Sequence, residues 1–218
     1  MRTVLLDLDG TLVDSAAVIT EHLGAALTSI GAPVPGPEKL RTLVGPPFET
    51  ALPELGLTEA ETAAVIIAYR STYDGVAASS SPLFPDTVEL LDRLRAQPYR
   101  LAVATSKPEH VARDIVRRKG LGGVELVGGA DHPLGRVGKA AVVGSVLERL
   151  GIYPPADPVV MVGDRVHDVE GAAEHGVPTI GVAWGYAEPG ELADALIVVA
   201  DIDELLKALK TDEVWSSF

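Results

Sequence analysis

The sequence has 218 residues and a formal charge of −13, from 18 basic and 31 acidic side chains, and it contains no cysteine. A chain of this length can bury the interior of one large domain, or of a core with a smaller inserted domain. Its acidity excludes an electrostatic footprint for nucleic acid or an anionic membrane, and the missing cysteines exclude thiol catalysis, thiolate metal sites and disulfides. No secretory signal and no apolar run near the roughly 18 residues of a spanning helix occur, so we expect a soluble, cytoplasmic protein.

Short apolar runs recur along the chain and predict the strands of a parallel sheet. Five strands are indicated by the runs TVLLDL, RLAVAT, PVVMVGD, PTIGVAW and ALIVVA. Continuous runs of this kind are typical of strands that are covered on both faces. Helical patterns separate most of them, as in the apolar stripe of Val142, Val143, Val146, Leu147 and Leu150. This alternation fits βαβ crossovers and predicts an α/β fold.

The stretch from Ser15 to Pro82 interrupts the alternation. It contains no convincing strand, and it begins with an apolar stripe at helical spacing: Ile19, Leu23, Ala26, Leu27 and Ile30. A proline-rich turn, PVPGP, precedes further helical patterns. We therefore expect residues 15–82 to form a helical insert in a core made of residues 1–14 and 83–218.

Polar side chains follow four of the predicted strands, at the sheet edge where open parallel sheets bind ligands. The first strand runs into the stretch VLLDLDGT, and the last of the four precedes GDRVHD. In chain order, the four ends supply Asp7 and Asp9, Thr105 and Ser106, Lys139, and Asp164 and Asp168.

The acidic members of this set predict a metal site. Asp7 and Asp9 project to the same side if strand geometry holds to the end of the first strand. Asp164 and Asp168 are four residues apart and share one face if a helical turn follows. Because converging carboxylates repel one another, a divalent cation is expected to neutralise them, and oxygen-only ligands favour Mg²⁺ over zinc.

The remaining members predict a phosphate site opposite the acids. Thr105 and Ser106 end a strand before a helix start, so their hydroxyls and free backbone N–H groups could hold phosphate oxygens. Lys139 is the only basic residue that the sequence ties to a strand end, and its charge could balance the acids. The order acid pair, hydroxyl, lysine, acid pair favours phosphate chemistry.

With these motifs the whole chain resembles the haloacid dehalogenase superfamily of hydrolases. The resemblance rests on DLDGTLVDS, on ATSK, on the lysine in GRVGKA and on VGDRVHDVEGA. The segment LVGPPFE and the form of the last motif are similar to phosphoglycolate phosphatase-like members, whereas the lysine motif departs from their common K-P-x-P form. The resemblance implies a Rossmann-like doubly wound parallel core, with residues 15–82 as an α-helical cap domain.

The resemblance also implies a role for each site residue. Asp7 would be the nucleophile that forms an aspartyl-phosphate, and Asp9 the acid and base. Mg²⁺ would be held by Asp7, the backbone carbonyl of Asp9 and Asp164, with Asp168 in support. The remaining phosphate ligands would be Thr105, Lys139, and the backbone amides of Leu8, Asp9 and Ser106.

The leading interpretation is thus an Mg²⁺-dependent phosphatase that hydrolyses a small phosphorylated metabolite, as a monomer or homodimer. A phosphomutase, a 5'-nucleotidase, a pyrophosphatase and a non-catalytic binding module of the same fold stay open as alternatives. The sequence names no substrate, and it leaves the roles of Arg165, His167 and the turn Gly45–Pro47 unassigned.

Overall fold

In the computed structural model, which describes residues 1–215, six parallel strands form one sheet in the order β3-β2-β1-β4-β5-β6. The strands are β1 (Arg2–Leu6), β2 (Tyr99–Pro108), β3 (Leu126–Ala130), β4 (Val159–Gly163), β5 (Thr179–Val182) and β6 (Ile197–Val199). The chain runs outward from β1 to one edge, returns to β4 and runs to the other edge. This is the doubly wound, Rossmann-like order, so the predicted fold class is confirmed.

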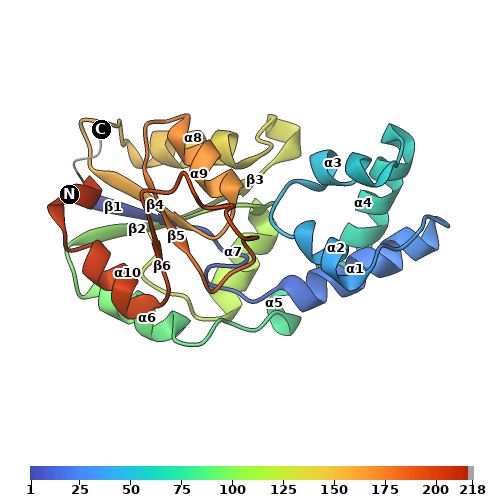
Figure 1. Cartoon of the computed structure of the whole chain (residues 1–218), viewed down its shortest axis with the longest axis horizontal. Helices are drawn as coiled ribbons and strands as arrows, with labels where there is room; N and C mark the ends of the chain where they lie inside the picture. Colours follow the sequence, from blue (N-terminus) through green and yellow to red (C-terminus); the bar gives the residue numbers. More distant parts are fainter. Residues whose placement is uncertain (216–218) are drawn as a thin grey trace.

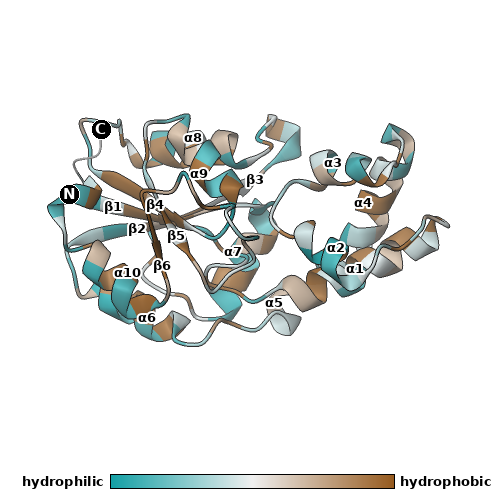
Figure 2. Cartoon of the chain, viewed as in Figure 1, coloured by the Kyte–Doolittle hydropathy of each residue, from teal (hydrophilic) through white to brown (hydrophobic). Residues whose placement is uncertain are grey.

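The five apolar runs correspond to β1, β2, β4, β5 and β6, and the hydrophobic colour is plain along β4, β5 and β6 in Figure 2. The run for β3 was harder to recognise because its sequence, LVGGA, holds two glycines. A Cβ atom at Gly128 would lie 2.2 Å from the side chain of Val146, so the glycine allows a helix to pack closely on this strand. The strand β2 continues three residues beyond RLAVAT, to Pro108.

Helices cover both faces of the sheet (Figure 1). One face carries α6 (Thr87–Arg95), α7 (Glu109–Arg118) and α10 (Ile202–Ala208), and the other carries α8 (Lys139–Leu150) and α9 (Val166–Ala173). Single turns of 3-10 helix are η2 (His132–Leu134) and η3 (Asp212–Trp215). Along β1, Leu6 packs toward the first face and Leu5 toward the second. Because side chains alternate, Asp7 follows Leu5 to the face of α8.

Between β1 and α6 the described chain is helical and contains no named strand. Its helices are α1 (Ala16–Ser29), α2 (Pro37–Thr42), α3 (Phe48–Ala51), η1 (Pro53–Leu55), α4 (Glu59–Tyr73) and α5 (Ala77–Ser80). A capping box, in which Thr58 and Glu61 bond each other's backbone N–H groups, begins α4. The Asp14 N–H donates to the Pro82 carbonyl at 2.9 Å, so the two ends of this helical insert lie side by side.

The insert lies beyond the carboxyl ends of the strands (Figure 1) and shares one apolar cluster with the core. Leu23, Leu27 and Val65 belong to the cluster that also contains Val4 of β1. The contact places the helices of the insert over the sheet edge that the polar motifs reach. The domain limits at residues 15 and 82 stay a prediction.

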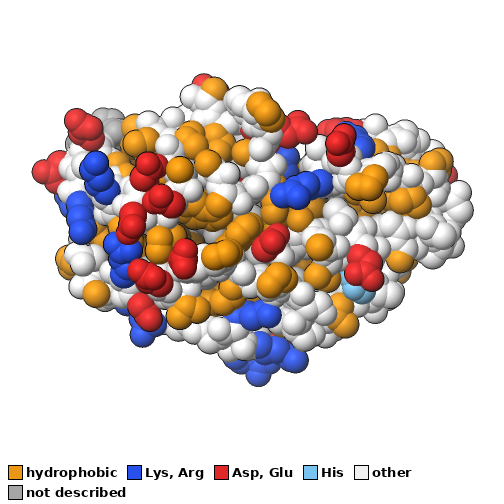
Figure 3. All heavy atoms as spheres, turned by 60° about the horizontal axis from the view of Figure 1, so that its bottom comes forward, with side chains coloured by type: hydrophobic (Ala, Val, Ile, Leu, Met, Phe, Trp, Pro, Cys, Tyr) orange, Lys and Arg blue, Asp and Glu red, His pale blue; other side chains and the backbone are white. Residues whose placement is uncertain are grey.

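The surface agrees with the acidic composition. On the face in Figure 3, lysine and arginine side chains stand in separate groups among acidic and hydrophobic ones. Within residues 1–215, no helix has the length and apolarity needed to cross a membrane.

Candidate active site

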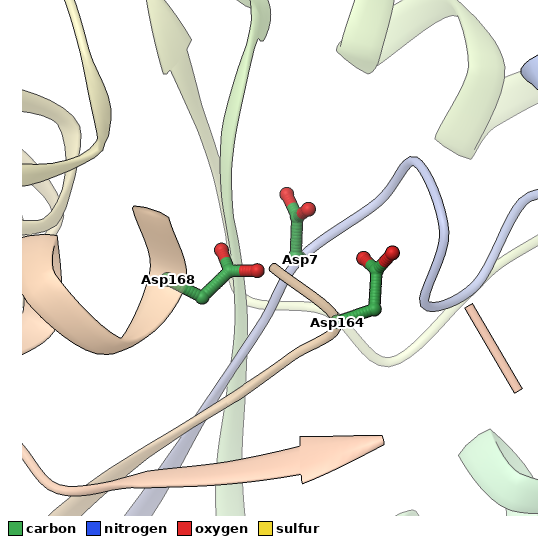
Figure 4. Close-up of side chains that lie close together, drawn as sticks. All are labelled: Asp7, Asp164 and Asp168. Atoms are coloured by element: carbon green, nitrogen blue, oxygen red, sulfur yellow. The ribbon is translucent and has the colours of Figure 1, made fainter. Parts of the chain in front are cut away.

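Three aspartates from separate motifs meet at the carboxyl edge of the sheet. Asp7 follows β1, Asp164 follows β4, and Asp168 lies in the first turn of α9. One carboxylate oxygen from each residue lies within 4.8 Å of the oxygens from both others, and all three side chains are buried. Figure 4 shows the three carboxylates pointing into one space. They meet because β1 and β4 are adjacent parallel strands, whose ends share an edge.

Glycine and backbone N–H groups fix these carboxylates. A Cβ atom at Gly10, which has a φ of +87°, would lie 2.1 Å from the Asp164 carboxylate, so only glycine leaves room for it. The Tyr186 N–H donates to Asp164 at 2.8 Å. The Arg165 N–H donates to Asp168 at 3.0 Å, which caps α9. The side chains are therefore held in place before any ligand arrives.

Lys139, the first residue of α8, neutralises part of this charge. Its buried Nζ lies 2.7 Å from Asp7 Oδ1, 2.6 Å from Asp168 Oδ1 and 3.0 Å from the Ala104 carbonyl. Burial disfavours the ammonium, but the carboxylates of Asp168 and Asp7 outweigh that cost and raise the pKa of Lys139. The single positive charge of Lys139 thus contacts two of the three carboxylates and offsets one negative charge.

The negative charge that Lys139 does not offset contributes to raised pKa values of the aspartates. Burial raises the pKa of Asp7 to about 6, with Asp168 and Asp9 adding to the rise and Lys139 opposing it. Burial, followed by the charges of Asp168 and Asp7, also raises the pKa of Asp164. Each of these carboxylates is easier to protonate because its charge lacks a sufficient counter-charge.

The chemistry of the donor set fits a divalent cation. The cluster offers carboxylate oxygens only, and the buried Oδ1 atoms of Asp7 and Asp168 lack an aligned hydrogen bond. A hard cation that takes oxygen ligands would supply the missing positive charge. The described residues could therefore hold such an ion at Asp7, Asp164 and Asp168.

Asp9 has different partners, although it lies only two residues from Asp7. Its carboxylate lies outside the three-aspartate cluster. Oδ1 accepts from the Ser15 hydroxyl at 2.6 Å, and Oδ2 lies 2.8 Å from Lys107 Nζ. Lys107 Nζ also donates to the Tyr73 hydroxyl at 2.8 Å, and Tyr73 belongs to α4 of the insert. The two acids of VLLDLDGT are thus paired with two different lysines.

Lys107 corrects the expectation that Lys139 is the only basic residue at a strand end. The sequence signal was present, because Lys107 belongs to ATSK and stands two residues after Thr105, on the same side of a strand. It was missed because Thr105 and Ser106 were expected to end the strand and Lys107 to begin the next helix, whereas β2 continues to Pro108.

Two of the expected phosphate ligands, Thr105 and Ser106, line one cavity with Asp7 and Asp9, whereas Lys139 lines a neighbouring groove. Thr105 is buried, and its hydroxyl accepts from the Lys107 N–H at 3.3 Å. Ser106 Oγ is buried without a hydrogen-bond partner. Asp7, Asp9, Thr105 and Ser106 all line the cavity, which lies between the sheet edge and the insert. The Leu8 carbonyl accepts from the backbone N–H groups of the next turn, whereas the predicted role of the amides of Leu8, Asp9 and Ser106 stays a prediction.

Comparison with known proteins decides the family. The model of the haloacid dehalogenase-like hydrolases matches residues 4–182. The chain belongs to this family. The prediction of a phosphatase-like hydrolase of the haloacid dehalogenase family is therefore confirmed.

Three relatives illustrate its range. The tyrosine-protein kinase PtkA of Mycobacterium tuberculosis is 42% identical over 213 residues, which cover 95% of this chain and 72% of that protein. A 5'-nucleotidase of Pseudomonas aeruginosa is 33% identical, covering 87% and 86% of the two chains. The crystal structure of a predicted phosphatase from Clostridium acetobutylicum is 31% identical, with a TM-score of 0.89 over 95% of this chain and 97% of that one. Phosphoglycolate phosphatases also match.

In this haloacid dehalogenase-like chain, two features that the sequence left unassigned contact each other. Arg165 pairs with Glu191 at 2.6 Å, and its guanidinium donates to the backbone carbonyls of Val44 and Thr42 in the insert. The turn Gly45–Pro47 follows directly and lines the cavity. Arg165, next to Asp164, thus fastens the insert to the core beside the aspartate cluster.

His167 does not reach the cavity. It is half-buried, and it lines a separate groove between the insert and the core. Burial, together with the charge of Arg165, lowers the pKa of His167. The imidazole is therefore neutral near pH 7.

Proposed function

We propose that this protein is an Mg²⁺-dependent phosphatase that hydrolyses a small phosphorylated metabolite through an aspartyl-phosphate on Asp7. The observation that carries the proposal is the different pairing of Asp7 and Asp9. Asp7 stands with Asp164 and Asp168 beside Lys139, whereas Asp9 stands apart with Lys107 and Ser15. This difference supports attack by Asp7 and proton transfer by Asp9.

In the first step, an oxygen of Asp7 forms a bond to phosphorus while the bond to the leaving oxygen breaks. Asp9 gives that oxygen its proton. In the second step, Asp9 takes a proton from water, whose oxygen attacks phosphorus and releases Asp7 and phosphate. Lys139 neutralises negative charge on Asp7 and on the phosphoryl oxygens. Thr105 and Ser106, near the end of β2, donate hydrogen bonds to the phosphoryl oxygens.

Mg²⁺ would be held by the carboxylates of Asp7 and Asp164 and the backbone carbonyl of Asp9, with Asp168 supporting the site. When bound, it shields the charge of the nucleophile from the charge of the phosphate. A donor set made of oxygen alone supports a hard ion such as Mg²⁺ over zinc.

The cavity supports a small substrate. Its volume is ≈ 90 Å³, which lies below the roughly 300–1,000 Å³ of pockets for drug-sized ligands. Walls from both the core and the insert enclose it, so the insert acts as the cap that excludes water.

A panel of phosphorylated metabolites tests the proposal. Free phosphate should appear only with Mg²⁺, and the panel should include phosphoglycolate, nucleoside monophosphates, sugar phosphates and pyrophosphate. A product phosphorylated at a new hydroxyl would indicate a phosphomutase instead. Absence of phosphate release from every compound would contradict the proposal.

The identity to PtkA supports a second candidate, transfer of a phosphoryl group to tyrosine. ATP labelled at its γ-phosphate distinguishes the two. The phosphatase releases labelled phosphate, whereas a tyrosine kinase leaves alkali-stable label on protein.

A further inference from the structure

The insert lines the cavity mainly with apolar and aromatic side chains. Phe48 meets Tyr69 edge-on, with ring centroids 4.8 Å apart, and Tyr69 stacks on Tyr73 at 4.7 Å. Leu43 and Val44 add aliphatic surface. The Tyr73 hydroxyl is already bonded to Lys107. This wall offers a leaving group apolar contact more than hydrogen bonds.

Within the described chain, the lysine and the arginine that line the cavity each already face a carboxylate of the protein. Lys107 pairs with Asp9 at 2.8 Å. Arg70 of α4 lies 3.4 Å from Glu49 of α3, and His132 of the core lies 3.3 Å from the same oxygen. Arg70 also contacts His132 at 2.9 Å. The carboxylate of Glu49 thus occupies the place where a substrate carboxylate would meet Arg70.

Two carboxylates outside the proposed chemistry line the same cavity, namely Glu49 and Asp74. A leaving group with a second negative charge would approach both, and it would have to displace Glu49 from Arg70 to gain a counter-charge. An uncharged leaving group meets neither cost. Like charges brought together in a partly desolvated site disfavour the charged ligand strongly.

Resting on the proposed phosphatase function, we infer that the site selects monoesters whose leaving group is small, uncharged and apolar or aromatic. It discriminates against leaving groups that carry a second anion, phosphoglycolate among them. The protein then shares the fold of phosphoglycolate phosphatases but differs from them in substrate class.

An isosteric pair of substrates tests this inference. Isobutyl phosphate matches phosphoglycolate in shape, with an isopropyl group in place of the carboxylate. We expect kcat/KM for isobutyl phosphate to exceed that for phosphoglycolate by roughly 10- to 100-fold, and benzyl phosphate to be accepted too. Equal values, or a preference for phosphoglycolate, would overturn the inference.

Binding of non-hydrolysable analogues separates this inference from the proposed function. Calorimetry should show 3-methylbutylphosphonate binding at least ~10-fold more tightly than 3-phosphonopropionate. That result, without phosphate release from any ester, would refute the phosphatase and keep the selectivity. Tighter binding of 3-phosphonopropionate would refute the selectivity, whatever the activity.

The variant Glu49→Gln tests the physical cause. It keeps the side chain's shape, removes one carboxylate and releases Arg70. The ratio of kcat/KM between isobutyl phosphate and phosphoglycolate should fall ~10-fold or more. Glu54→Gln is the control, because Glu54 lies on the same insert but lines a separate groove and pairs with Lys39, so the ratio should not change. An unchanged ratio in Glu49→Gln would show that Glu49 does not exclude anions.

Discussion

The carboxyl edge of the sheet and the seam between core and insert form two walls of one cavity, but they are built differently. At the edge, Asp7, Asp164 and Lys139 directly follow or begin regular elements, and strand pairing sets their positions. At the seam, contacts such as Arg165 with Val44 and Lys107 with Tyr73 join residues far apart in sequence. We therefore assign the chemistry to the residues at the sheet edge. We assign closure of the insert and substrate selectivity to the contacts at the seam.

Metal removal should have the largest effect on the rate of phosphate release, because it takes the positive charge away from the aspartate cluster at the sheet edge. EDTA should abolish phosphate release, and added Mg²⁺ should restore it. Ca²⁺ should inhibit, since its larger and looser coordination misplaces Asp7. Full activity in chelator, measured as free phosphate, would contradict the assignment of the chemistry to a metal site at the sheet edge.

The variant Lys139→Gln should have the second-largest effect on activity. Loss of its contacts to Asp7 and Asp168 leaves buried carboxylates without their cation, so kcat should fall roughly 10²- to 10³-fold and the free energy of unfolding by about 3 kcal/mol. Mg²⁺ should raise the melting temperature of the variant more than that of the unmodified protein, because it replaces the missing charge. Exposed Lys210 provides the control Lys210→Gln. Equal rises in melting temperature on addition of Mg²⁺ to both variants would contradict a metal site beside Lys139.

Lys107→Met should have an intermediate effect, because Lys107 belongs to both regions. Asp9 loses one of its two partners, so kcat should fall roughly 10- to 100-fold, and more for alkyl than for nitrophenyl esters, which need little protonation. Tyr73→Phe keeps the ring stack and removes only the hydroxyl bonded to Lys107, so its loss should be smaller. The same loss for both ester types would separate Lys107 from proton transfer.

Arg165→Gln should have the smallest effect of the series. The variant loses the bonds to the Thr42 and Val44 carbonyls and the pair with Glu191, but no group of the aspartate cluster. KM should rise up to ~10-fold while kcat changes less, because closure of the insert becomes less favourable. Arg117→Gln on the exposed side of α7 is the control. A drop in kcat with an unchanged KM would place Arg165 in the chemistry.

The same contrast explains what could be predicted from the sequence. Strands and edge residues were predictable because a buried strand needs an unbroken apolar run, and Asp7, Asp9 and Asp164 follow such runs directly. The strand β3 was harder to see because Gly128 is required by close packing of α8 and Gly129 by the nearby backbone of Lys107 and Glu109. The cytoplasmic location and the monomer or homodimer stay predictions.

The seam could not be predicted in the same way. Its pairs, such as Arg70 with His132, are separated by dozens of residues and depend on how the insert packs. Nothing in GDRVHD indicates that Arg165 reaches the turn before Gly45. Only the extent of β2, which placed Lys107 beside Thr105, was within reach of sequence reasoning.

Rapid-quench labelling of the variants Asp7→Asn and Asp9→Asn tests the central claim most directly. With p-nitrophenyl phosphate, Asp7→Asn should form no phosphoenzyme, because the attacking anion is gone. Asp9→Asn keeps the nucleophile and loses a proton shuttle typically worth roughly 10²- to 10⁴-fold, so it should show a burst and a trapped phosphoenzyme that hydrolyses slowly. Peptide mapping should place the label on the tryptic peptide of residues 3–39 of Asp9→Asn, which contains Asp7. Label on Asp7→Asn, or indistinguishable kinetics for the two variants, would contradict the assignment of Asp7 as the nucleophile.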